Sequence, residues 1–461
     1  MPLSRRTFNA SLLAVAAPPV RPPNVVYIIL DDLGLNDTGC YGSQQIATPN
    51  IDRLAAAGVR FTAAYSGCTV CAPARCTLMT GKHMGHATVR ANPGGVSLQA
   101  GDVTLAQVLQ KAGYTCGGFG KWGIADLDTP GVPEKHGFSR FFGYYHQVHA
   151  QSYYPEYLID TGRKVPLPGN AGTFEKKPAT KPGTTFSAQR IFDEMKAWLR
   201  ANSAKPFFCY APWTIPHGKP EIPADDPAWL LYRDKPWNLD TRIHAAFVSM
   251  ADRFVGETIA LLEELGVAGN TLVFFSSDNG AASRYEGELD SAGGLRGKKT
   301  SMYEGGIRIP LLVKFPGRIP AKTTSDLPVY FPDILPTVAE FTGTQNLLPP
   351  HLDGLSFAPE ITGQRKLPRN RPMYWEWNEA HFALPYKVRM QACRRGKWKI
   401  TRDNVAQPWE LYDLSTDPGE SKDLAASQPK LVAELDQWVR ANRVDPPEQI
   451  DPPRPNGQKW R

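Results

Sequence analysis

The fold is decided by the stretch Asn24-Val25-Val26-Tyr27-Ile28-Ile29-Leu30-Asp31-Asp32. An almost unbroken apolar run leads directly into two aspartates. Such a run is typical of a β-strand that is buried on both faces, as in a parallel sheet covered by helices. The run at residues 271–276 has the same character and is followed by Asp278 and Asn279. Two buried strands with polar ends therefore lie at the centre of the predicted fold.

Helical and extended patterns alternate along the first 368 residues. Strands that alternate with helices predict an α/β fold, here a large domain with a mostly parallel or mixed central sheet flanked by helices. The expected helices are at residues 50–57, 102–112, 187–201 and 239–265. Further strands are expected at residues 114–119, 206–211 and 309–315.

The pattern changes near residue 368, where short strands joined by turns replace the alternation. This pattern predicts a small C-terminal α+β domain with an antiparallel sheet and one helix at residues 369–461, ending in a proline-rich tail. The large domain then spans residues 22–368. The short strands are expected at residues 373–377, 389–394, 397–401 and 410–414, and the helix at residues 431–440.

The N-terminus has the pattern of an export signal. Ser4-Arg5-Arg6-Thr7-Phe8 precedes an apolar run at residues 10–17, and Ala14-Val15-Ala16 offers small residues for cleavage. This order predicts a twin-arginine signal peptide at residues 1–17 and a periplasmic or secreted protein. A chance arginine pair is the alternative. The run is too short to span a bilayer, and no later segment is apolar enough, so no membrane span is expected.

Composition places the chain among globular enzymes. Of the 461 residues, 42% are hydrophobic and 21% are charged, and the formal net charge is +7. No dense block of lysine and arginine is present, so nucleic acid is not an expected partner. The chain has seven cysteines, and full pairing in an exported protein would leave one over.

Acidic side chains at the two strand ends suggest a metal site. The carboxylates of Asp31 and Asp32 repel each other unless a cation lies between them, and Asp278 and Asn279 follow a second buried strand. Oxygen ligands of this kind suit Ca²⁺ or Mg²⁺. Each pair taken alone could also be an ordinary turn, because aspartate and asparagine are common at strand ends.

A cysteine cluster at residues 68–81 carries the second constellation. Pro73 and Gly81 have the positions of helix start and stop signals, so Cys71 is expected beside a helix N-terminus that favours an anion. Arg75 on the first turn could add a guanidinium. A redox or zinc-binding C-x-x-C pair formed by Cys68 and Cys71, or a structural disulfide of Cys68 or Cys76, remains an alternative.

Cys71-Ala72-Pro73-Ala74-Arg75 followed by Leu78-Met79-Thr80-Gly81 resembles the signature of type I, formylglycine-dependent sulfatases, which belong to the alkaline phosphatase-like superfamily. A short signature needs its context, and further family motifs follow in order over nearly the whole mature chain. These motifs are residues 24–32, Gly120-Lys121-Trp122, Pro216-His217, Ser277-Asp278-Asn279-Gly280, Leu295-Arg296-Gly297-Lys298-Lys299, Tyr303-Glu304-Gly305-Gly306, Glu410-Leu411-Tyr412-Asp413-Leu414 and Asp417-Pro418.

The resemblance implies the cofactors and the metal ligands. Cys71 would be oxidised to formylglycine (3-oxoalanine) by a formylglycine-generating enzyme, and the hydrated aldehyde would bind Ca²⁺, with Mg²⁺ the weaker alternative. A cysteine or serine lacks the second hydroxyl that expels sulfate. The implied metal ligands are Asp31, Asp32, Asp278, Asn279 and modified Cys71.

The resemblance also implies roles for cationic side chains in a sulfuric ester hydrolase. Arg75, Lys121 and Lys299 would neutralise the sulfuryl oxygens, and His217 would protonate or hydrogen-bond the leaving oxygen. Lys298 adjoins Lys299 and is the alternative for its role.

One position departs from the family pattern. Many members carry a histidine two residues after the lysine of Gly-Lys-Trp, and this chain has Gly123 there. The residue that assists sulfate release is therefore open. Four histidines are candidates, although a surface or pocket-wall role is the simpler interpretation for each: His83, His86, His146 and His149.

Substrate specificity is expected from loops at the strand ends. A sulfated carbohydrate or a small aryl sulfate is the expected substrate, by analogy with the family. Packing in the core or between domains is the competing interpretation for the aromatic residues. The candidate substrate-binding residues are His86, Arg90, His149, Tyr154 and Trp375.

Three other functions remain open from the sequence. A phosphomonoester or phosphodiester hydrolase of the same superfamily could use a similar metal site. A non-catalytic glycan-binding relative is a second alternative, although Cys71, Arg75 and His217 are all retained. A redox protein built on Cys68 and Cys71 is the third.

Overall fold

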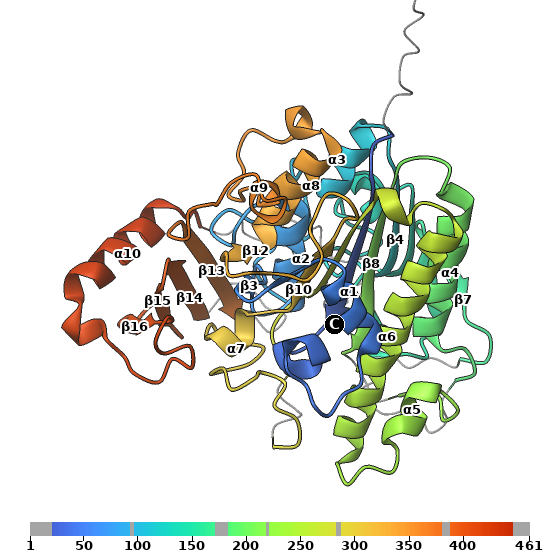
Figure 1. Ribbon diagram of the computed structural model, residues 1–461, viewed down its shortest axis with the longest axis horizontal. Coiled ribbons are helices and arrows are strands. Elements are labelled where there is room, and N and C mark those ends of the chain that lie inside the picture. The colour runs from blue at the N-terminus through green and yellow to red at the C-terminus, as the bar shows by residue number, and fades with distance from the viewer. Residues whose placement is uncertain are drawn as a thin grey trace, which may run out of the picture.

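The computed structural model of the chain has a large part built on one sheet and a smaller part built on another (Figure 1). The N-terminal signal expected at residues 1–17 and most of the proline-rich tail lie outside the described residues. The structure describes residues 21–92, 96–170, 183–217, 221–282, 287–379 and 388–445.

The described residues of the large part form a sheet of ten strands in the order β11-β2-β10-β9-β1-β8-β4-β5-β6-β7. A small ribbon of β3 (Ala64–Tyr65) and β12 (Val329–Tyr330) lies beside it. The strands are β1 (Asn24–Asp31), β2 (Val59–Phe61), β4 (Thr115–Lys121), β5 (Arg140–Tyr144), β6 (Tyr157–Asp160), β7 (Arg163–Pro166), β8 (Phe207–Pro216), β9 (Thr271–Ser277), β10 (Leu311–Lys314) and β11 (Thr323–Ser325).

The centre of the sheet is parallel, as the sequence predicts. β1 pairs in parallel with both β8 and β9, and β4 pairs in parallel with β8 and β5. Antiparallel strands stand towards both edges, because β10 runs against β9 and β6 runs against β5. The expectation of a mostly parallel or mixed sheet flanked by helices is confirmed.

Strand β1 shows why its run of apolar residues is continuous. Val25, Tyr27 and Ile29 face one core cluster, whereas Val26 and Ile28 face another, and all five are buried. Alternate residues of a strand point to opposite faces, so both faces must be apolar when helices cover both.

Helices cover both faces of the sheet (Figure 1). Residues of α4 and α6 contribute to the core on one face, and residues of α2, α3 and α8 contribute to the core on the other. Among the described residues, no helix is both long enough and apolar enough to cross a membrane. The helices of the large part are α1 (Pro49–Ala56), α2 (Cys71–Thr80), α3 (Leu105–Lys111), α4 (Ser187–Asn202), α5 (Pro227–Tyr232), α6 (Leu239–Glu264), α7 (Glu304–Ile307), α8 (Ile334–Thr342) and α9 (Ala358–Ile361).

The smaller part consists of an antiparallel sheet and helix α10 (Pro429–Ala441). Tyr374 packs with α10, whereas the next residue, Trp375, packs into the core of the large part. Burial of both faces of its first strand fixes this sheet against the large part. Its strands are β13 (Pro372–Glu379), β14 (Val388–Arg395), β15 (Trp398–Arg402) and β16 (Glu410–Asp413).

Candidate active site

The acidic ends of β1 and β9 meet at one edge of the sheet. These strands are neighbours and run in the same direction, so their carboxyl ends coincide. The backbone N–H of Asp32 donates to Oδ1 of Asp278 at 3.2 Å, and Nδ2 of Asn279 donates to Oδ1 of Asp32 at 2.8 Å. Asp32 has a φ of 68°, a left-handed conformation in which the chain turns away from β1.

Cys71 is the first residue of α2 and points into this acidic cluster. Its thiol donates to Oδ1 of Asp31 at 3.3 Å, and Nζ of Lys299 donates to its sulfur at 3.3 Å. One ligand atom from each of Asp31, Asp32, Cys71 and Asp278 lies within 4.8 Å of the others. Burial raises the pKa of the Cys71 thiol to about 12, so an unmodified thiol is a poor nucleophile here.

Two buried cations neutralise the same carboxylates. Lys121, at the end of β4, places Nζ 2.6 Å from Oδ2 of Asp31. Arg75, one turn into α2, donates from two nitrogens to Oδ2 of Asp278 at 2.8 and 3.1 Å. Burial alone would raise the pKa of Asp31, but the charges of Lys121, His217 and Arg75 outweigh it and hold that pKa well below its ordinary value.

Lys299 and His217 form the more accessible side of the cluster. Lys299 is bonded to Oδ1 of Asp32, and Nε2 of His217 lies 3.5 Å from Oδ2 of the same residue. Their side chains are 17% and 13% exposed, whereas those of Arg75 and Lys121 are fully buried. A substrate must therefore approach past Lys299 and His217. Burial lowers the pKa of His217 to about 4, so the imidazole is neutral near pH 7.

The donor set fits a hard divalent cation. Oδ1 of Asn279 is buried and has no hydrogen-bond partner, which is costly unless a ligand is bound there. Burial and the charge of Asp31 raise the pKa of Asp278 to about 6. Three carboxylates and one amide oxygen around a buried point are the oxygen ligands that Ca²⁺ and Mg²⁺ prefer.

Comparisons with known proteins agree with this geometry. The sulfatase family model matches residues 23–344, and a model named N-sulphoglucosamine sulphohydrolase, C-terminal matches residues 296–444. Arylsulfatase A of Bos taurus is 32% identical over 475 residues, which cover 93% of this chain and 88% of that protein. The chain belongs to the sulfatase family. It is a sulfuric ester hydrolase.

Two further comparisons extend this result. N-acetylgalactosamine-6-sulfatase of Rattus norvegicus is 32% identical to this sulfatase over 440 residues, which cover 89% of this chain and 77% of that protein. A crystal structure of Ps i-CgsB in complex with k-i-k-neocarrahexaose superimposes with a TM-score of 0.76 and 26% identity, covering 92% of this chain and 94% of the other. The likeness therefore extends over both parts of the sulfatase.

Several residues that the sequence suggested for substrate binding lie elsewhere in the sulfatase. Arg90 is buried and donates to the carbonyl oxygens of Ala87 and Gly85. The indole of Trp375 is buried and donates to the carbonyl of Ser66. These two side chains are occupied by the protein itself, so packing explains them better than substrate binding does.

The remaining substrate candidates have internal contacts too. His149 bonds through Nε2 to the carbonyl of Tyr157 at 2.8 Å, and its side chain is buried. Tyr154 is buried beside Phe186 in the core over α6. His86 is half-exposed and bonds through Nδ1 to Asp353 at 2.9 Å. None of these contacts brings the three residues to the metal cluster.

The structure shows what occupies the place of the missing family histidine. Gly123 has a φ of +79°, and a Cβ added there would come within 2.7 Å of Nε2 of Gln147. Gln147 is buried and donates to the carbonyl of Gly123 at 2.9 Å. Sequence reasoning missed Gln147 because it lies 24 residues along the chain, and no motif marks it.

Tyr153 is a second residue that the sequence did not single out. Its hydroxyl donates to the carbonyl oxygen of His217 and so positions the backbone that carries the imidazole. The ring packs between Phe186 and Phe247, which fixes its direction. An aromatic residue within an aromatic stretch gives no signal of such a role, because core packing explains the same pattern.

The cysteines do not form the redox arrangement that was considered. All seven cysteine positions lie in the described residues, and each is a free thiol. Cys68 donates to the carbonyl of Glu376 at 3.4 Å, whereas Cys71 faces Asp31 and Lys299. The two members of the C-x-x-C pair thus serve different surroundings, which disfavours a disulfide-exchange function.

Proposed function

We propose that this sulfatase hydrolyses a sulfate ester through a hydrated formylglycine formed from Cys71, with Ca²⁺ held by Asp31, Asp32, Asp278 and Asn279. The observation that carries the proposal is the position of Cys71, whose sulfur lies 3.3 Å from both Asp31 and Lys299. A side chain at this position contacts the oxygens that suit a divalent cation and an ammonium group at the same time.

The cation, when bound, would lower the pKa of a coordinated hydroxyl so that it can act as a nucleophile near neutral pH. The chain's own residues perform the remaining work. Arg75 and Lys121 lie within the cluster and would neutralise charge on the sulfuryl oxygens. Their pairing with buried carboxylates fixes their positions before the substrate arrives, so little reorganisation is needed.

Lys299 and His217 are assigned to the leaving oxygen because they border the accessible side of the cluster. Burial tends to deprotonate Lys299, but the charges of Asp32, Cys71 and Asp31 keep its pKa raised, so it remains a proton donor. His217 is neutral near pH 7 and would contribute a hydrogen bond. The pair would thereby stabilise charge on the departing alcohol.

The substrate class we propose is a sulfated carbohydrate, with small aryl sulfates as artificial substrates. N-acetylgalactosamine-6-sulfatase is among the relatives, and a related structure contains k-i-k-neocarrahexaose. We also propose that residues 1–17 direct export by the twin-arginine route to the periplasm or beyond. Maturation would then require a formylglycine-generating enzyme acting on Cys71.

The proposal is tested by the mass of the tryptic peptide that contains Cys71, measured on enzyme that turns over an aryl sulfate. We expect the mass of an aldehyde in place of the thiol. Aryl sulfate and aryl phosphate are assayed in parallel with the same preparation. An active enzyme with unmodified Cys71, or a higher kcat/KM for the phosphate, would overturn the proposal.

A matched pair of variants separates the two neighbouring cysteines. Cys71→Ala should lower kcat at least about a thousandfold, because it removes the nucleophile. Cys68→Ala should retain activity, because that thiol faces the carbonyl of Glu376 instead of the cluster. Equal activity of the two variants would contradict the assignment.

A further inference from the structure

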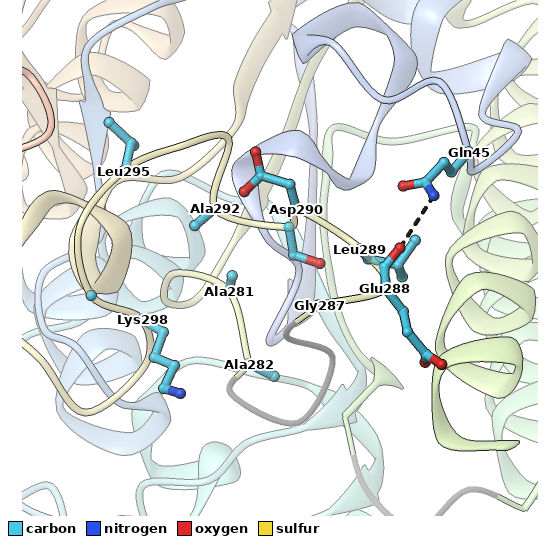
Figure 2. Close-up of a pocket in the computed structure, with 12 residues that line it drawn as sticks. Gln45, Ala281, Ala282, Gly287, Glu288, Leu289, Asp290, Ala292, Leu295 and Lys298 are labelled. Carbon is cyan, nitrogen blue, oxygen red and sulfur yellow. Dashed lines mark hydrogen bonds between the residues drawn. The ribbon is translucent and has the colours of Figure 1, made fainter. Parts of the chain in front are cut away.

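A pocket of about 530 Å³ opens beside the catalytic cluster, and we call it the side pocket (Figure 2). Its volume lies in the range of pockets that bind small molecules. None of the catalytic or metal-binding residues proposed above lines it. Its lining residues are Gln45, Ala281, Ala282, Gly287, Glu288, Leu289, Asp290, Ser291, Ala292, Leu295, Gly297 and Lys298.

The side pocket borders the catalytic cluster along two walls. Ala281 lines the pocket, and its carbonyl oxygen accepts from the backbone N–H of Lys299 at 2.9 Å. On another wall, the carbonyl of Ser291 accepts from the backbone N–H of Asn36 at 3.0 Å, within the loop that leaves Asp32. A group in the pocket would therefore sit next to a sulfate ester held beside Lys299.

The lining of the side pocket suits a hydroxyl-rich ligand. Alanine and glycine leave room beside the backbone, and acidic side chains offer oxygen acceptors. The carboxylate of Glu288 is fixed by the backbone N–H of Asn238 at 2.8 Å and by the hydroxyl of Thr241. Oδ1 of Asp290 accepts from the N–H of Gly294 at 3.1 Å.

The charge of the lining limits the class of ligand. Two acidic residues, Glu288 and Asp290, line the pocket together with a single basic residue, Lys298 (Figure 2). Negative charge on a ligand would be repelled by two carboxylates at close range. A neutral sugar ring carries many hydroxyl donors and no such penalty.

We propose that the side pocket binds an uncharged sugar unit adjacent to the sulfated unit, and that it selects against a second sulfate or a carboxylate there. The inference rests on the proposed function, since it places the pocket beside a sulfate ester. It assigns to this pocket the recognition of the neighbouring part of a glycan, which the catalytic cluster itself cannot distinguish.

The first test fills the side pocket. Ala292→Trp would place an indole in it, and Ala406→Trp, on an exposed turn of the smaller part, is the matched control. The probes are nitrophenyl sulfate, which has no sugar, and a panel of monosulfated galactose- or N-acetylgalactosamine-containing disaccharides. We expect Ala292→Trp to lower the ratio of kcat/KM for the best disaccharide to that for nitrophenyl sulfate by about tenfold or more.

The second test changes charge and preserves shape. Asp290→Asn keeps an oxygen that can accept from the N–H of Gly294. It should raise kcat/KM for a disaccharide with a second sulfate on the neighbouring unit by about threefold, relative to the monosulfated disaccharide. Gln45→Ala serves as a lining variant that leaves the charge unchanged and should not alter this relative value.

The outcomes separate the inference from the proposed function. Turnover of nitrophenyl sulfate without turnover of any disaccharide would overturn the side-pocket assignment alone. An unchanged ratio in Ala292→Trp, or an unchanged selectivity in Asp290→Asn, would do the same. Absence of turnover of every sulfate ester by enzyme that carries formylglycine would instead overturn the proposed function.

Discussion

The ammonium nitrogen of Lys121 lies 2.6 Å from Oδ2 of Asp31, and neither side chain is exposed to solvent. Each carboxylate of the cluster has such a partner, because Arg75 bonds to Asp278 and Lys299 bonds to Asp32. The buried charges are therefore balanced before any cation binds. A divalent cation would make the site net positive, which favours an anionic sulfate ester.

Removal of the Lys121 charge should affect both stability and turnover. Lys121→Met leaves Asp31 with less compensation, and a broken buried pair costs about 3–5 kcal/mol. We expect the loss of unfolding free energy to be smaller in Ca²⁺ than in chelator, because the cation replaces the missing positive charge. Denaturant unfolding in both buffers measures this difference.

The matched control for this experiment is Lys196→Met. Lys196 pairs with Glu257 at 3.0 Å on the surface, and exposed pairs contribute only about 0–1 kcal/mol. Equal losses in the two variants, or a loss in Lys121→Met that Ca²⁺ does not reduce, would contradict the prediction.

Lys299 and its neighbour Lys298 should differ strongly in catalysis. Lys299 contacts Asp32 and Cys71, whereas Lys298 lines the side pocket. We expect Lys299→Met to lower kcat for an aryl sulfate by about a hundredfold to a thousandfold, as removal of a preorganised donor does. Lys298→Met should lower it less than about tenfold. The reverse order would assign the catalytic role to Lys298.

Removal of the cation should unfold the sulfatase at a lower temperature and abolish turnover. A ligand present at about a thousand times its Kd stabilises the folded state by about 4 kcal/mol. We expect chelation to lower Tm and Ca²⁺ to restore it, with Mg²⁺ less effective. Asn279→Ala should weaken Ca²⁺ binding, because it removes the buried oxygen that lacks another partner. A Tm that does not respond to chelator would argue against the site.

The sequence predicts the centre of the fold better than its edges. The apolar run of β1 is unambiguous, because both of its faces are buried. The pairing of β2 and β11 could not be read from three residues each, because their partners are brought together by tertiary contacts. The reach of β8 to Pro216 was also underestimated, because Pro212 and Pro216 interrupt the strand pattern.

The same contrast holds for the site. Residues fixed by strand ends and by α2, such as Asp278 and Arg75, converge as the motifs suggest. The direction of Arg90 could not be predicted, because it depends on carbonyl groups that the loop after α2 presents. Gln147 was invisible for the converse reason, since its position matters only because Gly123 leaves room for it.

A buried ion pair between the two parts should govern stability in acid. Nζ of Lys399 lies 3.0 Å from Oε1 of Glu304 and 2.9 Å from Oε1 of Glu420, and all three side chains are buried. Burial raises the pKa of Glu304, but the charges of Lys399, Arg308 and others outweigh it and lower this pKa to about 2. The contribution of Glu304 is therefore complete above the ordinary value of 4.5 and is lost as the pH falls towards 2.

The size of this effect follows from the shift. A change from 4.5 to about 2 corresponds to about 3 kcal/mol of unfolding free energy. Burial raises the pKa of Glu420, which shares Lys399, so the net loss should be somewhat smaller. Glu304→Gln should destabilise the protein by about 3 kcal/mol at pH 7 and by much less at pH 2, because glutamine cannot ionise.

Unfolding free energies of the wild type, Glu304→Gln and the exposed control Glu263→Gln, measured between pH 2 and pH 7, test this prediction. The curves of the wild type and Glu304→Gln should converge as the pH falls, whereas the control should run parallel to the wild type. Parallel curves for Glu304→Gln would show that its carboxylate does not stabilise the contact between the two parts through its charge.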